Sequence, residues 1–152
     1  MAASAGPAPV SVAILDFELI DTSLEGASRG VDKAETARLI LITDRLRGLL
    51  AASGRYTVVD LAPAASKIAD AGLIHGCNGC DTAIASALGA SRVITGTVQK
   101  ISTLILTLSI VEREAASGRD LQIATAQIRG NTDQSWSRGV EWLVQNRMLA
   151  GQ

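Results

Sequence analysis

The sequence has few aromatic residues and no long apolar run. Phenylalanine, tyrosine and tryptophan make up 3% of its 152 residues, and the whole stock is Phe17, Tyr56, Trp136 and Trp142. So few rings leave little to stack on bases or sugars, which counts against single-stranded nucleic acid and carbohydrate as ligands. A membrane-spanning helix needs about 18 or more consecutive apolar residues, and no such stretch is present. We therefore predict no transmembrane segment.

Charge of one sign is not concentrated anywhere in the chain. The 14 Lys and Arg residues oppose 15 Asp and Glu residues, which gives a net charge of -1 with no run of like charge. Proteins that bind phosphate backbones carry a basic patch or stripe. We therefore predict no nucleic-acid partner.

The first ten residues, MAASAGPAPV, lack the basic and apolar regions of a signal peptide. Such a small, uncharged start is typical of an exported protein whose signal peptide has been removed, and equally of the frayed start of a cytoplasmic protein. We predict a flexible segment over residues 1–10. A single α/β domain over residues 11–150 is expected to follow, because a chain of this length builds one hydrophobic core.

The clearest periodicity lies in residues 88–118. Apolar residues alternate over 93–98 and again over 104–110, which is the period of two in a β-strand. A turn at Ser117-Gly118 leads to a third strand over 121–128, so the three strands are expected to form an antiparallel meander. The strand over 104–110 is expected near the centre of the sheet, with helices on its apolar side.

The rest of the chain alternates strands and helices. We predict strands over 11–17 and 56–60, and helices from Lys33 to the Ser53-Gly54 stop, over 64–71, over 81–88 with Asp81 as cap, and after residue 133. Residues 18–32 have no periodicity and predict a long surface loop. The fold class is therefore α/β, with one mixed five-stranded sheet in the order β-α-β-α-α-β-β-β-α and helices packed on it. In the last helix, Trp136 is expected in the core.

Several short motifs resemble those of TolB amino-terminal domains and CsgG-like envelope proteins. They are Ile14-Leu15-Asp16-Phe17, Ser53-Gly54-Arg55-Tyr56, Leu88-Gly89-Ala90, Ile94-Thr95-Gly96-Thr97-Val98 and Ser117-Gly118. The combination of Asp16-Phe17-Glu18-Leu19, the cysteine pair, and residues 129–136 is similar to an uncharacterised family of short proteobacterial exported proteins. The resemblance implies a TolB-like, periplasmic, non-catalytic domain that binds other proteins. The cysteine pair departs from the TolB-like pattern.

Cys77 and Cys80, the only cysteines, form a CxxC motif just after the only histidine, His75. We favour a disulfide, because Asn78-Gly79 is a turn pair that brings the sulfur atoms together, and a loop this short contributes about 2 kcal/mol. A redox-active dithiol is a second interpretation, since a helix begins just beyond the pair. A zinc or copper site formed by His75, Cys77 and Cys80 is a third.

No catalytic set is recognisable. The serines lack a nucleophile-elbow context, one histidine leaves no triad to assemble, and a glycine-rich phosphate loop is missing. We therefore predict a non-enzymatic protein without a cofactor. The alternative is a metal-binding or thiol-redox accessory protein that acts through the cysteine pair and His75, and a weaker one is a small-ligand sensor.

The expected partner is another envelope protein or a second copy of this chain. Acidic residues follow the first strand, where ligands of open α/β sheets bind, although a solvated acidic loop is the commoner explanation of such a cluster. We predict partner contacts through Glu18, Asp21 and Glu25 of this segment, and through Trp142 on the last helix.

Overall fold

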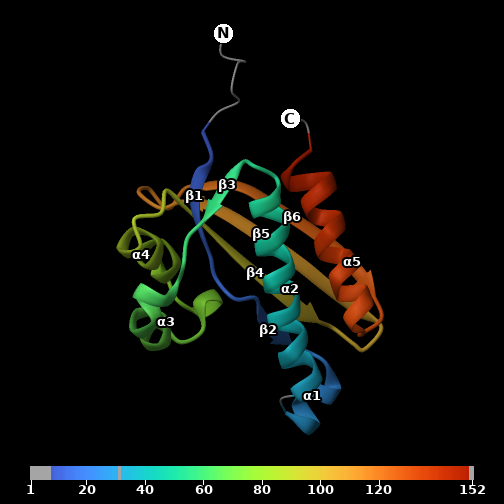
Figure 1. Ribbon diagram of the computed structural model, residues 1–152. Coiled ribbons are helices and arrows are strands. Elements are labelled where there is room, and N and C mark those ends of the chain that lie inside the picture. Colours follow the sequence, from blue (N-terminus) through green and yellow to red (C-terminus); the bar gives the residue numbers. More distant parts are fainter. Residues whose placement is uncertain (1–7, 31, 151–152) are drawn as a thin grey trace.

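The computed structural model describes residues 8–30 and 32–150. They form a mixed β-sheet with helices on both faces (Figure 1). The strands are β1 (Val10–Ile14), β2 (Glu18–Asp21), β3 (Tyr56–Val58), β4 (Arg92–Lys100), β5 (Ile105–Glu114) and β6 (Asp120–Arg129). The helices are α1 (Leu24–Arg29), α2 (Lys33–Ala52), α3 (Ala65–Ala71), α4 (Cys80–Ala87) and α5 (Asp133–Leu143). Of the segment predicted to be flexible, residues 1–7 lie outside the described part, and Val10 already belongs to β1.

The predicted mixed α/β sheet is confirmed, but it has six strands instead of five. The strand order is β3-β1-β4-β5-β6, and β2 pairs with β4 beyond the end of β1. β1 runs parallel to β3 and β4, whereas β4, β5 and β6 form the predicted antiparallel meander. β5 therefore lies between two partners from Leu106 to Arg113, but β4 and not β5 is the middle strand of the order.

The extra strand arises because β1 and β2 pair with successive halves of the long strand β4. Ile14 is opposite Ile94 and Glu18 is opposite Thr97. The three residues 15–17 between β1 and β2 therefore lie opposite only two residues of β4, 95–96, and the chain bulges outward there. At the bulge, the ring of Phe17 covers Gly96, where any Cβ would collide with it. The Phe17 amide donates a hydrogen bond of 2.9 Å to Oγ1 of Thr43 on α2.

The prediction of a long loop over residues 18–32 is wrong. The segment contains β2 and the short helix α1, whose N-cap Ser23 accepts a hydrogen bond from the amide of Gly26. All four residues of β2 are half-buried, so the strand has no strict alternation that would mark it in the sequence. Helix α1 has only six residues and a glycine in its middle, which leaves no room for helical periodicity.

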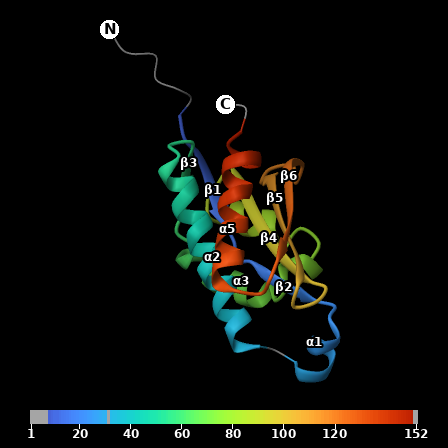
Figure 2. The same ribbon diagram turned by 90° about the vertical axis from the view of Figure 1, so that its right-hand side faces the viewer.

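The main core lies between the sheet and the pair of helices α2 and α5, which lie side by side on one face (Figures 1 and 2). On the side of α2 that faces the sheet, Ile42, Leu46 and Leu50 are fully buried at the helical spacing of four residues. Trp136 of α5 is also fully buried, as predicted. Its indole Nε1 donates to Oδ1 of Asn131, which satisfies the only polar atom of the ring.

A smaller core lies on the opposite face, where α3 and α4 pack against β1 and the start of β4 (Figure 1). These two helices leave most of the meander uncovered. The side chains that β4, β5 and β6 present on this face are therefore half-buried or exposed, and we call them the open face: Thr95, Thr97, Thr107, Ser109, Val111, Ile123 and Thr125.

The predicted positions of the later helices are confirmed to within a few residues, but the predicted cap of α4 is wrong. Gly79 is its N-cap, in the left-handed conformation at φ 85°, and Asp81 lies inside the first turn. α5 begins with a capping box formed by Thr132 and Ser135. Across the described residues, no helix has the length and apolarity required to cross a membrane.

Candidate functional site

A cavity of about 550 Å³ lies between the open face and the loop that joins α3 to α4. Thr95, Thr97 and Val111 form its floor, and His75 and Cys77 belong to the overhanging loop. Because α3 and α4 cover only part of this face, the loop is the boundary between covered and open sheet. The cavity is the place where Cys77, His75 and the segment that follows β1 come together.

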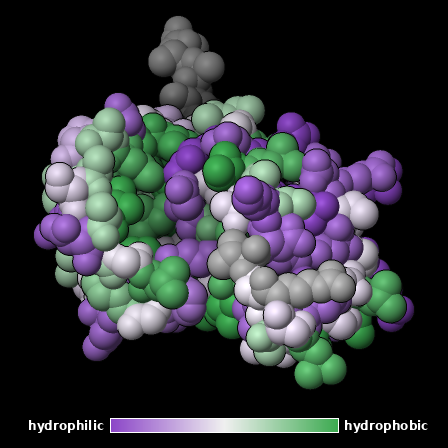
Figure 3. All heavy atoms as spheres, turned by 90° about the horizontal axis from the view of Figure 1, so that it is seen from below, coloured by the Kyte–Doolittle hydropathy of each residue, from purple (hydrophilic) through white to green (hydrophobic). Residues whose placement is uncertain are grey.

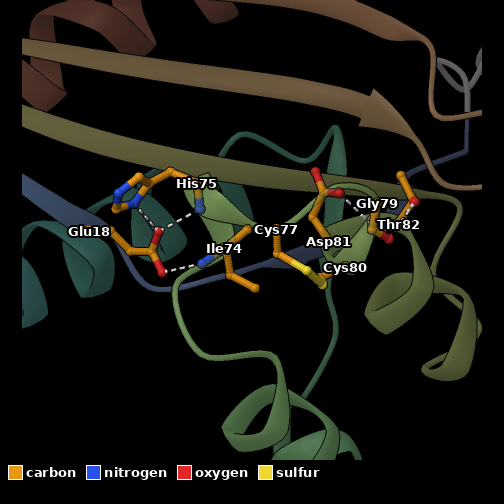
Figure 4. The surroundings of a disulfide bond; sticks show 8 residues. All are labelled: Glu18, Ile74, His75, Cys77, Gly79, Cys80, Asp81 and Thr82. Atoms are coloured by element: carbon orange, nitrogen blue, oxygen red, sulfur yellow. Dashed lines mark hydrogen bonds and ion pairs between the residues drawn. A yellow bond between two sulfur atoms is a disulfide. The ribbon is translucent and has the colours of Figure 1, made fainter.

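Glu18 of β2 fixes this loop to the sheet (Figure 4). Its Oε2 accepts a hydrogen bond of 2.7 Å from the amide of Ile74, and its Oε1 accepts one of 2.8 Å from the amide of His75. The Nδ1 atom of His75 lies 2.7 Å from the same Oε1 atom. The Glu18 side chain is only 14% exposed. The carboxylate therefore acts inside the molecule, as an anchor for the loop.

Cys77 and Cys80 lie at disulfide-bonding distance, with their Cα atoms 5.7 Å apart. Cys80 is the first residue of α4, so a bond between them ties the loop to the start of that helix. The imidazole of His75 points toward Glu18 and away from the two sulfur atoms (Figure 4). Over the described ranges, no three His, Cys, Asp or Glu side chains are grouped closely enough to hold a metal ion.

Asp81 binds Arg113 of β5 across the cavity wall. Its Oδ2 lies 2.6 Å from Nη1 of Arg113, whose Nε lies 2.7 Å from Oδ1 of Asp120. Partial burial would lower the pKa of Arg113, but the hydrogen bonds and charges of the two carboxylates raise it. The pair thus joins α4 to the end of the meander, which explains why Asp81 is buried and is not the helix cap.

The acidic residues that follow β1 do not converge on one point. The carboxylate of Asp16 is exposed and lies 3.0 Å from Arg47 of α2, whereas Glu18 holds the loop. Asp21 accepts hydrogen bonds from the amide and hydroxyl of Ser23; burial opposes its ionisation, but these hydrogen bonds prevail and lower its pKa. Glu25 lies in the first turn of α1. Glu18 and Asp21 thus have structural partners in the fold.

A second hollow, of about 460 Å³, lies beside α3 and is mostly apolar. Figure 3 shows green surface lining a hollow next to the part of the molecule that carries α3 and α4. Glu18 and Ile74 line this hollow as well as the larger cavity. The Glu18 anchor therefore forms a wall common to both spaces.

Trp142 lies on the outer side of α5, next to the edge strand β6. It is 44% exposed, and the guanidinium of Arg147 stands 5.1 Å from its ring centroid. With Thr125, Gln127 and Gly139 it lines a shallow hollow over β6. Gly139 lets the helix approach the sheet closely, since a Cβ there would meet Ile128 at 2.8 Å.

Two clusters of buried charged residues were not predicted from the sequence. Lys100 and Glu35 form a buried ion pair of 2.7 Å. Glu112, only 1% exposed, accepts hydrogen bonds from Tyr56, Arg92 and Gln122. The alternation of the strand residues could have identified both clusters from the sequence. Lys100 falls on the inward-facing positions of β4, and Glu112 falls on those of β5. A charged residue at such a position needs a buried partner.

A family model described as "Protein of unknown function (DUF2380)" and called DUF3280 matches residues 10–148. This chain belongs to the DUF3280 family. No curated protein matches its sequence. The expectation of an uncharacterised family is confirmed, whereas nothing in the comparisons supports the narrower CsgG-like resemblance.

Solved structures show what the DUF3280 chain resembles in fold. The LpoB C-terminal domain from Salmonella enterica has 18% sequence identity and a TM-score of 0.58, covering 83% of this chain and 87% of that one. Lipoprotein GNA1162 from Neisseria meningitidis has 18% identity and a TM-score of 0.52, covering 92% and 98%. PelC from Paraburkholderia phytofirmans, solved as a dodecamer, has 10% identity and a TM-score of 0.54, covering 95% and 92%.

TolB from Acinetobacter baumannii is also similar, with 12% identity and a TM-score of 0.48 over 93% of this chain and 28% of that one. At these identities the likeness concerns the fold alone. The DUF3280 chain thus shares its mixed α/β architecture with proteins that include a lipoprotein.

Proposed function

We propose that this chain is a non-enzymatic periplasmic accessory protein of the cell envelope that binds another protein along the outer edge of β6. The main support for this proposal is that β6 is an edge strand of the sheet. The backbone groups on its outer side therefore have no strand partner within the described part of the chain. An edge strand of this kind accepts a strand from a partner by adding backbone hydrogen bonds.

The sequence of β6 lacks the usual protection of an edge. Between Asp120 and Arg129, residues 121–128 include no charged residue and no proline. Natural edge strands are commonly guarded by lysine, proline or an inward charge, because an unprotected edge pairs with other chains. The uncharged, proline-free stretch 121–128 is therefore suited to pairing with a strand of a partner.

Exposed apolar side chains flank the same edge on both faces of the sheet. Ile123 is 62% exposed on the open face, and Trp142 is 44% exposed on the helical face. Tryptophan is enriched among the residues that dominate protein interfaces. A strand added to β6 would therefore find backbone partners in the middle and apolar contacts on either side.

The envelope location rests on two supports. The cysteine pair at disulfide distance suits an oxidising compartment, and one protein of the same fold is a lipoprotein. The non-enzymatic role is supported by the charged groups around the cavity of about 550 Å³, because these groups hold the fold together. Glu18, Asp81 and Arg113 are each bound to other parts of the fold.

The test is site-specific photo-crosslinking in bacterial cells that express the protein with an export signal added. A crosslinking residue at Gln127, on β6, is expected to give one discrete product, whereas the same residue at the 90%-exposed Leu24 gives none. The double variant Ile123→Lys with Trp142→Ala should abolish the product. Equal products from both positions, or none from Gln127, would contradict the proposal, and light scattering of the purified protein distinguishes a second copy from another protein.

A further inference from the structure

A cavity of about 410 Å³ lies on the face of the sheet opposite the cysteine pair, where the start of β1 meets the end of the chain's last helix. Three arginines line it: Arg55 before β3, Arg92 at the start of β4, and Arg147 in the π-helical turn η3 (Val144–Met148). Glu112 is the only carboxylate among the described residues that line it. The chain as a whole has a net charge of -1, so this concentration of positive charge is local.

The single carboxylate is already occupied. Glu112 Oε1 accepts a hydrogen bond of 2.9 Å from the Tyr56 hydroxyl, and Oε2 lies 2.8 Å from Nη1 of Arg92. Gln122 donates a third hydrogen bond to it. Glu112 thus neutralises one of the three arginines and holds it in place against the cavity wall.

Arg55 and Arg147 have no carboxylate within 4 Å among the described residues. Arg55 uses one nitrogen to donate a hydrogen bond of 3.2 Å to the carbonyl of Leu149, and Arg147 stacks over Trp142. A guanidinium has five N–H donors, so both side chains retain donors for a ligand. The cavity therefore offers positive charge and hydrogen-bond donors that the fold itself does not use.

We propose that this cavity binds a small multivalent oxyanion, a phosphate ester or a polycarboxylate. Guanidinium groups pair with both kinds of oxyanion through two parallel hydrogen bonds, and several guanidinium groups favour a ligand with more than one negative charge. Arg92 is pre-oriented by Glu112, while Arg55 and Arg147 approach from the two chain segments that close the cavity. The site borders the β6 edge, because Leu121 and Gln122 of β6 line it and Arg147 contacts Trp142.

The test is isothermal titration calorimetry of the whole chain at low salt with pyrophosphate, with citrate, and with acetate as a monovalent comparison. Pyrophosphate or citrate is expected to bind, and acetate is expected to bind more weakly than either. The tighter of the two multivalent anions identifies the ligand as a phosphate ester or a polycarboxylate. A charged hydrogen bond is worth about 1.5 to 3 kcal/mol, so Arg147→Gln and Arg55→Gln are each expected to weaken binding about tenfold or more. Raising the salt concentration should weaken it further.

Arg138→Gln is the matched control, because Arg138 is exposed on α5 and does not line the cavity. It is expected to bind the anion as the unmodified protein does. Arg55→Lys separates loss of fold from loss of binding, since it keeps the charge beside Leu149. Failure of both multivalent anions to bind, or equal weakening by Arg138→Gln and Arg147→Gln, would overturn the proposal.

Discussion

The Nζ atom of Lys100 lies 2.7 Å from Oε2 of Glu35, and the two side chains are 4% and 1% exposed. Asn131 donates a further hydrogen bond to the same carboxylate. Burial alone would lower the pKa of Lys100, but the hydrogen bond and charge of Glu35, with the charges of Asp21 and Glu25, raise it. The pair thus joins the end of β4 to the first turn of α2.

Removing one member of this pair is expected to be strongly destabilising. Lys100→Met leaves Glu35 buried without its cation, and breaking a buried pair costs about 3 to 5 kcal/mol in the free energy of unfolding. The double variant Lys100→Met with Glu35→Leu is expected to recover much of this loss. Urea unfolding measures both. Arg45→Ala, which removes the exposed pair with Glu141, is the control and should cost about 1 kcal/mol or less.

Gly96→Ala is expected to destabilise the protein, because the new Cβ would collide with the ring of Phe17. Overpacking of this kind costs about 1 to 3 kcal/mol. Gly48→Ala is the matched control: it lies inside α2 with nothing within 4 Å of the new Cβ, and should stabilise by up to about 1 kcal/mol. If Phe17→Leu does not relieve the loss in Gly96→Ala, the collision is not its cause.

Tyr56 is expected to ionise at unusually high pH. Burial and the charge of Glu112 raise its pKa from 10.0 to about 12. As the only tyrosine of the chain, it can be followed by absorbance without interference from others. The unfolded state releases this proton first, so the stabilising contribution is complete below pH 10 and is lost as the pH rises toward 12. The loss is on the order of 2 to 3 kcal/mol.

Tyr56→Phe controls for the titration of other groups. This variant is expected to lose the contribution of Tyr56 to the fall in stability between pH 10 and 12. A titration of Tyr56 near pH 10 in the folded protein would show that the hydroxyl is not held by Glu112.

The cysteine pair is expected to be oxidised and free of metal. Alkylation before reduction should modify neither cysteine, whereas alkylation after reduction should modify both, as mass spectrometry can count. Cys77→Ser with Cys80→Ser should cost about 2 kcal/mol or less, because the closed loop is short. Free thiols, or one equivalent of zinc or copper by elemental analysis, would instead favour the thiol-redox or metal alternative. If metal is found, His75→Gln tests whether His75 is one of its ligands or only the hydrogen-bond partner of Glu18.

Local sequence patterns suffice to predict five of the six strands, most of the helices and the main core. Period two in β4 and β5 and helical spacing in α2 and α5 arise because one face of each element is buried. These patterns place Leu108, Ile42 and Trp136 in the core. The CxxC spacing likewise suffices to select Cys77 and Cys80 as a pair, because two intervening residues keep them close.

The partners of the charged groups, in contrast, follow from the tertiary structure. Glu18 faces the amides of Ile74 and His75, 56 and 57 residues away, and Arg55 reaches Leu149, 94 residues away. Contacts at such separation leave no local pattern, which is why the sequence predicts an acidic loop where β2 and the Glu18 anchor lie. The edge position of β6 and the convergence of three arginines on one cavity depend on strand order and helix packing, and neither is a property of any short segment.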